Sequence, residues 1–65
     1  MRNKIYEYRV LRRLSQQQLA DLCQVSRQTI NAVEKGKYAP SLELAFRLAK
    51  VFQTTVDELF QYDGI

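Results

Sequence analysis

Apolar residues recur every three or four positions along most of the 65-residue chain, a period that is typical of amphipathic helices. This period and the residues at its boundaries predict five helices, at about residues 3–13, 16–23, 27–34, 42–52 and 56–60. Gly36 and Pro40 mark the break between the third and fourth helices. The pattern therefore predicts an all-α fold, a compact five-helix unit in which residues 61–65 can form a short extended tail.

Residues that commonly begin helices support these boundaries. Ser15 and Gln18 have the spacing of a capping box, in which each side chain bonds the backbone amide of the other residue. Thr55 and Glu58 repeat this spacing before the last helix. Single residues with side chains suited to an N-cap precede the other three helices: Asn3, Ser26 and Ser41.

The apolar stripes of the helices define the expected core. In the second helix the stripe consists of Leu19, Ala20, Leu22 and Cys23. In the fourth helix it consists of Ala45, Leu48, Ala49 and Phe52, widened by Leu42 and Phe46.

Residues 15–36 are the most informative segment, because they predict two short helices joined by a tight turn. The small side chain of Ala20 allows the two helices to cross closely, and Ile30 and Val33 supply the inward side of the second one. This arrangement is typical of a helix-turn-helix, whose second helix enters the major groove of DNA.

The outward face of residues 27–34 suits base recognition. With Ile30 taken as the inward direction and about 100° per residue, four residues fall on the opposite side: Gln28, Asn31, Ala32 and Lys35. Amide side chains pair with adenine edges and arginine with guanine, and Arg27 lies in the first turn of the helix. Any exposed helix has a polar outer face, so this face supports DNA binding only together with the capping box, Ala20 and the inward spacing.

Charge is distributed unevenly along the chain, whose formal net charge is +3. Residues 1–38 carry +5 and residues 39–65 carry −2. The basic part contains the predicted helix-turn-helix, as contact with DNA phosphates requires. A basic face that only contacts solvent is the alternative interpretation.

Several classes of function are not expected. The chain has one cysteine and no histidine, so it has neither an internal disulfide nor a set of zinc ligands. Cys23 lies on an inward stripe and is expected to be a buried, inert thiol. No nucleophile–base group, signal peptide or membrane span is visible. The sequence predicts a cytoplasmic protein that is not an enzyme and uses no cofactor, metal or small-molecule ligand.

Residues 15–52 are similar to the Xre/Cro-type family of helix-turn-helix regulators, which includes lambdoid phage repressors. The likeness extends over roughly residues 3–60, and its most specific part is SRQTI followed by N-x-x-E-K-G-K-Y-x-P-S-L. The resemblance implies a single prokaryotic DNA-binding domain over residues 1–65. It also implies a homodimer that binds a palindromic operator and regulates transcription, most often as a repressor.

The resemblance also implies roles for individual residues. Those expected to face bases are Arg27, Gln28, Asn31 and Ala32. Those expected to contact phosphates are Gln16, Thr29, Lys35, Lys37 and Tyr38, with Thr29 and Asn31 as secondary candidates for either a phosphate or a base edge. Arg13 stands where the family usually has glycine, and its cation can add a further phosphate contact. Arg9 and Glu34 match a structural ion pair between the first helix and the end of the third, although Arg9 can also be an ordinary exposed cation. The family usually has glycine where this chain has Arg13 and Gln24, and a positive φ at those positions would cost about 1 kcal/mol.

Apolar residues beyond the expected core predict the homodimer interface: Leu44, Val51, Phe60, Tyr62 and Ile65. Alternatively, the tail folds back over the first helix and covers Tyr6 or Ile5. The alternative function is an antitoxin-like module that binds another protein and uses DNA binding for autoregulation.

Overall fold

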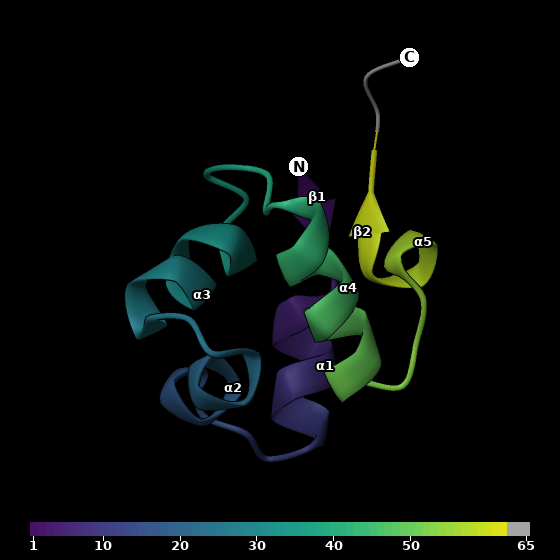
Figure 1. Cartoon of the computed structure of the whole chain (residues 1–65). Helices are drawn as coiled ribbons and strands as arrows, with labels where there is room; N and C mark the ends of the chain where they lie inside the picture. Colours follow the sequence, from purple (N-terminus) through teal and green to yellow (C-terminus); the bar gives the residue numbers. More distant parts are fainter. Residues whose placement is uncertain (63–65) are drawn as a thin grey trace.

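The computed structural model describes residues 1–62 and contains, within them, five helices and two short strands (Figure 1). In chain order the elements are β1 (Arg2–Asn3), α1 (Ile5–Leu11), α2 (Gln16–Cys23), α3 (Arg27–Glu34), α4 (Leu42–Val51), α5 (Val56–Leu59) and β2 (Phe60–Gln61). The five-helix prediction is confirmed. None of these helices is long and apolar enough to cross a membrane.

The helix boundaries follow the capping residues. Ser15 accepts a hydrogen bond from the Gln18 amide at 3.0 Å, and the Gln18 side chain accepts one from the Ser15 amide at 2.8 Å, which completes the predicted capping box. Ser26 and Ser41 also accept bonds from amides in the first turns of α3 and α4. These local bonds satisfy amides that have no partner within a helix, so α2 and α3 begin where the sequence predicts.

Asn3 departs from its predicted role, because it belongs to β1 and α1 begins after Lys4. Its side-chain oxygen still accepts a bond from the Ile5 amide at 3.0 Å. Its side-chain nitrogen donates to the carbonyl oxygen of Val33 at 2.8 Å. Asn3 therefore connects the beginning of α1 to the last turn of α3.

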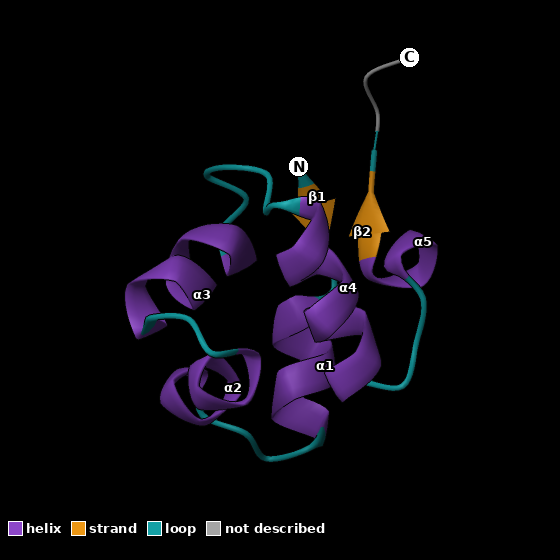
Figure 2. Cartoon of the chain, in the orientation of Figure 1, coloured by secondary structure: helices purple, strands orange, loops and turns teal. Residues whose placement is uncertain are grey.

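The two strands bring the ends of the described chain together (Figure 2). They pair antiparallel, with Arg2 opposite Gln61 and Asn3 opposite Phe60. The amide of Lys4 continues the contact and donates to the carbonyl oxygen of Leu59 at 2.9 Å. The expected extended segment is thus present, but it begins at Phe60 and is paired with the beginning of its own chain.

Each helix contributes to one apolar core. Its largest fully buried side chains are Ile5, Leu19, Ile30, Val33, Leu48, Phe52 and Leu59, with the smaller Cys23. Partly buried Tyr8, Leu14, Val25, Val51 and Phe60 pack against them.

The predicted core stripe of the fourth helix, Ala45, Leu48, Ala49 and Phe52, is confirmed, but the residues at its edges were predicted wrongly. Leu44 is only 6% exposed and belongs to the core, so it cannot form a dimer surface. Conversely, Leu42 and Phe46 are 71% and 59% exposed. The helix carries apolar residues on most of its circumference, and its buried stripe is widened by Leu44 and not by Leu42 and Phe46. Leu22, which was expected on the inward stripe of α2, is also exposed.

Four of the described helix ends contain a residue with a positive φ: Arg13, Gln24, Gly36 and Gln53, with φ of 57°, 60°, 72° and 55°. The expectation for the two non-glycine positions at 13 and 24 is confirmed, and the one at 53 was not predicted. After α3 the Gly36 amide bonds Val33 and the Lys37 amide bonds Ala32, the paired bonds of a Schellman motif. A Cβ atom at Gly36 would also lie 2.9 Å from the Met1 carbonyl oxygen, so glycine is required there for space as well.

Candidate nucleic-acid interface

Helices α2 and α3 form the two arms of a helix-turn-helix (Figure 1). Ala20 of α2 is fully buried, as are Ile30 and Val33 on the inner side of α3. Between the arms, Gln24 adopts the left-handed conformation, and the Val25 amide bonds the Ala20 carbonyl oxygen at 3.0 Å. The turn therefore fixes the angle at which α3 leaves α2, while the outer side of α3 stays uncovered.

The outer side of α3 is polar along its length. Arg27 and Gln28 in the first turn are exposed, and Asn31 and Ala32 in the next turn are half-buried. Thr29 is half-buried, and its hydroxyl oxygen lies 3.0 Å from that of Ser26, so Thr29 also belongs to the cap of the helix. Four other residues predicted to contact phosphate flank the motif and are exposed: Arg13, Lys35, Lys37 and Tyr38.

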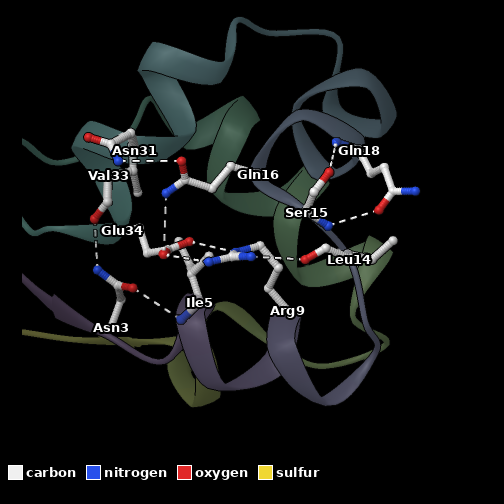
Figure 3. A network of polar contacts seen from close by, with 10 residues as sticks. All are labelled: Asn3, Ile5, Arg9, Leu14, Ser15, Gln16, Gln18, Asn31, Val33 and Glu34. Carbon is white, nitrogen blue, oxygen red and sulfur yellow. Dashed lines mark hydrogen bonds and ion pairs between the residues drawn. The ribbon is translucent and has the colours of Figure 1, made fainter.

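Arg9 and Glu34 form the expected ion pair between α1 and α3 (Figure 3). Two parallel bonds join them, from Arg9 Nε to Glu34 Oε2 at 2.9 Å and from Arg9 Nη2 to Glu34 Oε1 at 3.0 Å. The third guanidinium nitrogen donates to the Leu14 carbonyl oxygen at 2.9 Å. The two side chains are only 13% and 9% exposed. Arg9 is therefore not an ordinary surface cation, and its bond to Glu34 raises the pKa of its guanidinium.

Gln16 extends this network across α2 (Figure 3). Its side-chain nitrogen donates to Glu34 Oε1 at 3.5 Å, and its side-chain oxygen accepts from Asn31 Nδ2 at 3.4 Å. Both polar ends of the residue predicted to contact phosphate are thus engaged inside the protein. The sequence shows a glutamine at the start of α2, but the spacing along the chain does not reveal that it bridges two residues of α3.

Residues 5–59 match the model of the helix-turn-helix family. The chain belongs to this family and is of its Xre-like type. The family is a class of DNA-binding proteins without enzymatic activity, so the protein is a transcriptional regulator with a helix-turn-helix DNA-binding domain.

Individual helix-turn-helix relatives resemble nearly the whole chain. An uncharacterised HTH-type transcriptional regulator of Methanocaldococcus jannaschii is 52% identical over 63 residues, which cover 97% of this chain and 96% of that one. A regulator of the same description from Bacillus subtilis is 42% identical over 60 residues, covering 92% and 91%. The crystal structure of the restriction-modification controller protein C.AhdI from Aeromonas hydrophila aligns with a TM-score of 0.79 and 33% identity, over 88% of this chain and 86% of that one.

Two further arginines of this helix-turn-helix protein bond helix ends. Arg12 donates to the carbonyl oxygens of Tyr8 at 3.2 Å and Phe52 at 2.8 Å, and its guanidinium lies over both of their rings. Arg47 donates to the carbonyl oxygen of Cys23, the last residue of α2, at 2.9 Å. Counting basic residues therefore overestimates the charge available to DNA, because Arg9 and Arg12 hold the fold together.

Cys23 is fully buried, as the sequence predicts. Burial raises the pKa of its thiol, and the nearby charge of Arg47 opposes this rise. A buried thiol that keeps its proton is a poor nucleophile, so its part in this helix-turn-helix protein is packing.

Proposed function

We propose that this protein is a sequence-specific repressor that binds a palindromic operator as a homodimer, with α3 in the major groove. One observation carries this proposal: α3 buries Ile30 and Val33 completely and leaves Arg27 and Gln28 exposed at its N-terminal end. In the helix-turn-helix arrangement, that end of the second helix is the part that reaches the base edges.

The residue types on α3 define its expected base contacts. Arg27 suits the two acceptors of guanine, and the amides of Gln28 and Asn31 suit the acceptor and donor of adenine. The methyl group of Ala32 suits contact with the methyl group of thymine. Together these residues would read a short run of base pairs in each half-site.

The phosphate contacts fall to residues at the two ends of the motif. The cations Arg13, Lys35 and Lys37 are exposed, and Tyr38 is exposed next to them in the loop after Gly36. Thr29 is half-buried in the first turn of α3, where backbone amides favour an anion. For Gln16, which begins α2, only the backbone amide is assigned to phosphate, because its side chain bonds Glu34 and Asn31. Such contacts fix the register of the protein on DNA, while α3 reads the sequence.

Dimerisation would rest on the exposed apolar residues of the acidic half. Because Leu44 is buried, we assign this contact to Leu42 and Phe46 of α4 and to Tyr62, which is 68% exposed. Val51 and Phe60 pack partly on the core and would lie at the edge of the contact. The remaining predicted residue, Ile65, lies outside the described residues.

The dimer supports the assignment as a repressor. Two-fold symmetry would place the α3 helices about 34 Å apart, one turn of DNA, which matches a palindrome. A dimer on such a site would cover DNA that other proteins need, in the cytoplasm of a prokaryotic cell. The likeness to a controller protein supports a role in gene regulation.

Selection of bound sequences from a random DNA library tests the reading of bases. The wild type should enrich one palindrome, and Gln28→Ala should lose about 1–3 kcal/mol on it and relax the preference at one or two base pairs. The exposed Gln61 of β2 gives a matched control, since Gln61→Ala should bind like the wild type. An equal loss by Gln28→Ala on every sequence would contradict its role.

Sedimentation tests the dimer separately. The wild type should sediment as a dimer at tens of micromolar, and Phe46→Glu should shift it toward monomer without unfolding it, because Phe46 is exposed. A wild-type monomer that still binds a single half-site tightly would remove the dimer from the proposal.

A further inference from the structure

The carboxylate of Glu34 receives donors from two other helices. Arg9 of α1 occupies both of its oxygens, and Gln16 of α2 donates to Oε1 (Figure 3). A carboxylate of this kind only accepts hydrogen bonds. The two bonds from Arg9 hold the carboxylate in place, and only 9% of the Glu34 side chain is exposed. Glu34 is therefore the member of the network that can act only as an acceptor, and we call this its fixed polarity.

That fixed polarity determines the orientation of two amides in series. The two ends of a glutamine or asparagine amide are nearly equal in shape, so hydrogen-bond partners decide which end points where. Because Glu34 can only accept, Gln16 must turn its nitrogen toward Glu34 and its oxygen toward Asn31. Because that oxygen can only accept, Asn31 must in turn present its nitrogen to Gln16, as the 3.4 Å contact shows.

The bond to Gln16 uses only one of the hydrogen-bonding groups of the Asn31 side chain. The side-chain nitrogen of asparagine has two hydrogens, and one remains after the bond to Gln16. The remaining hydrogen and the side-chain oxygen form the donor and acceptor that adenine pairs with in the major groove. The network thus orients the half-buried side chain of Asn31 and leaves its oxygen and one hydrogen to pair with a base.

We propose that Gln16 is a positioning residue for base recognition, which transmits the fixed polarity of Glu34 to Asn31. This inference rests on the proposed function, in which Asn31 faces the bases. It changes two expectations from the sequence, since Gln16 was predicted to contact phosphate and the ion pair of Arg9 and Glu34 to be structural only.

Two substitutions of Gln16 separate positioning from phosphate contact. Gln16→Met keeps the length of the side chain and removes both polar ends. Gln16→Lys keeps a donor for Glu34 and adds a positive charge, but it has no acceptor for Asn31. The control is Gln17→Met, one residue further on α2, because Gln17 is exposed and its side chain bonds Asp21 at 2.9 Å.

The base preference of each variant is measured by library selection and by titration of single-base variants of the preferred site. Asn31→Ala should reduce discrimination at its base pair roughly tenfold. Gln16→Met and Gln16→Lys should reduce it at the same base pair by at least about threefold. Gln16→Met combined with Asn31→Ala should lose no more than Asn31→Ala alone. Gln17→Met should keep the wild-type preference, and thermal unfolding of each variant confirms that it is folded.

Other outcomes overturn the inference. A loss that is equal on every sequence for Gln16→Met, and regained by Gln16→Lys, would make Gln16 a phosphate contact. Losses that add in the double variant would make Gln16 and Asn31 independent. An unchanged preference in Asn31→Ala would remove Asn31 from base reading while leaving the proposed function intact. If the wild type enriches no sequence, the proposed function fails and the inference fails with it.

Discussion

Two arginine–glutamate ion pairs within residues 1–62 differ in their surroundings. Arg9 and Glu34 meet through two bonds of 2.9 and 3.0 Å, with side chains 13% and 9% exposed. Arg47 and Glu43 meet through one bond of 3.2 Å on neighbouring turns of α4, with side chains 40% and 77% exposed. An exposed pair is screened by water and contributes little, whereas loss of one partner from a buried pair leaves a charge without compensation.

The difference also concerns what each pair connects. The pair at Arg9 joins α1 to the last residue of α3, so it holds the proposed recognition helix against the rest of the fold. The pair at Arg47 lies within α4. Arg47 connects α4 to another helix only through its bond to the Cys23 carbonyl oxygen at the end of α2. Identical residue types therefore act as a connection between helices in one place and as a surface contact in the other.

The largest expected effect is the loss of the buried partner. Glu34→Ala should lower the free energy of unfolding by about 3 kcal/mol, because Arg9 would remain mostly buried without its counter-charge. Glu43→Ala is the matched control and should cost less than about 0.5 kcal/mol. Urea denaturation of both variants measures the difference. Equal losses of stability in the two variants would contradict the claim that the buried pair matters more than the exposed one.

A smaller effect, in the stabilising direction, is expected from glycine substitutions at two residues that follow helices in the left-handed backbone conformation. Arg13 follows α1, the helix of Arg9, and Gln53 follows α4, the helix of Arg47, with φ of 57° and 55°. Arg13→Gly and Gln53→Gly should each raise the free energy of unfolding by about 0.5–1 kcal/mol, since glycine adopts this conformation without steric cost. Equal gains would show that backbone strain is alike at the two sites and that the ion pairs alone distinguish them. A loss at either site would mean that the arginine or glutamine side chain contributes more than its strain costs.

Salt should distinguish the two pairs by a few tenths of a kcal/mol. Raising the ionic strength from about 0.1 to 1 M shortens the screening length from about 10 to 3 Å. The cost of Glu43→Ala should disappear at the higher salt concentration, while the cost of Glu34→Ala should remain. Denaturation midpoints at both concentrations test this, and a Glu34→Ala cost that disappears with salt would place that pair in solvent.

The smallest expected effect is a change of stability with alkaline pH that depends on Cys23, whose carbonyl oxygen accepts the bond from Arg47. Burial raises the thiol pKa in the folded protein, so the unfolded chain loses this proton first as pH rises. The contribution of the protonated thiol to the free energy of unfolding is complete below the ordinary thiol pKa of about 8.5 and decreases as the pH rises above that value. Cys23→Ala should flatten this decrease between about pH 7 and 9.5 relative to the wild type. Parallel curves for the two proteins would contradict it.

The sequence predicts those parts of the fold that depend on neighbouring residues. The bounds of α2 and α3 are correct because Ser15 and Ser26 bond amides only three positions away. The buried stripe of α4 was also predicted, but not the side on which it widens, because Leu42 and Leu44 are equally apolar and lie on different sides of the helix. Which of them is buried depends on where the other helices lie.

The same distinction holds for the site. The pair of Arg9 and Glu34 was found because a resemblance to known regulators supplied information that helical spacing lacks. The bridge from Gln16 to Asn31 depends on the side-chain conformations of two helices at their crossing point, which no local pattern contains. The extended segment at the end of the chain was expected, but β1 and its pairing with β2 were missed, because two residues are too few to show a period and the two strands lie at opposite ends of the described chain.

The pairing of β1 with β2 has a consequence for the order of folding. Bringing Asn3 to Phe60 closes a loop of almost the whole chain, and closure of a long loop costs more entropy than the local contact of α2 with α3. We therefore expect the strands to pair late, after the helix-turn-helix has formed. Since Asn3 also bonds Val33, the last turn of α3 gains this anchor only in the final step of folding.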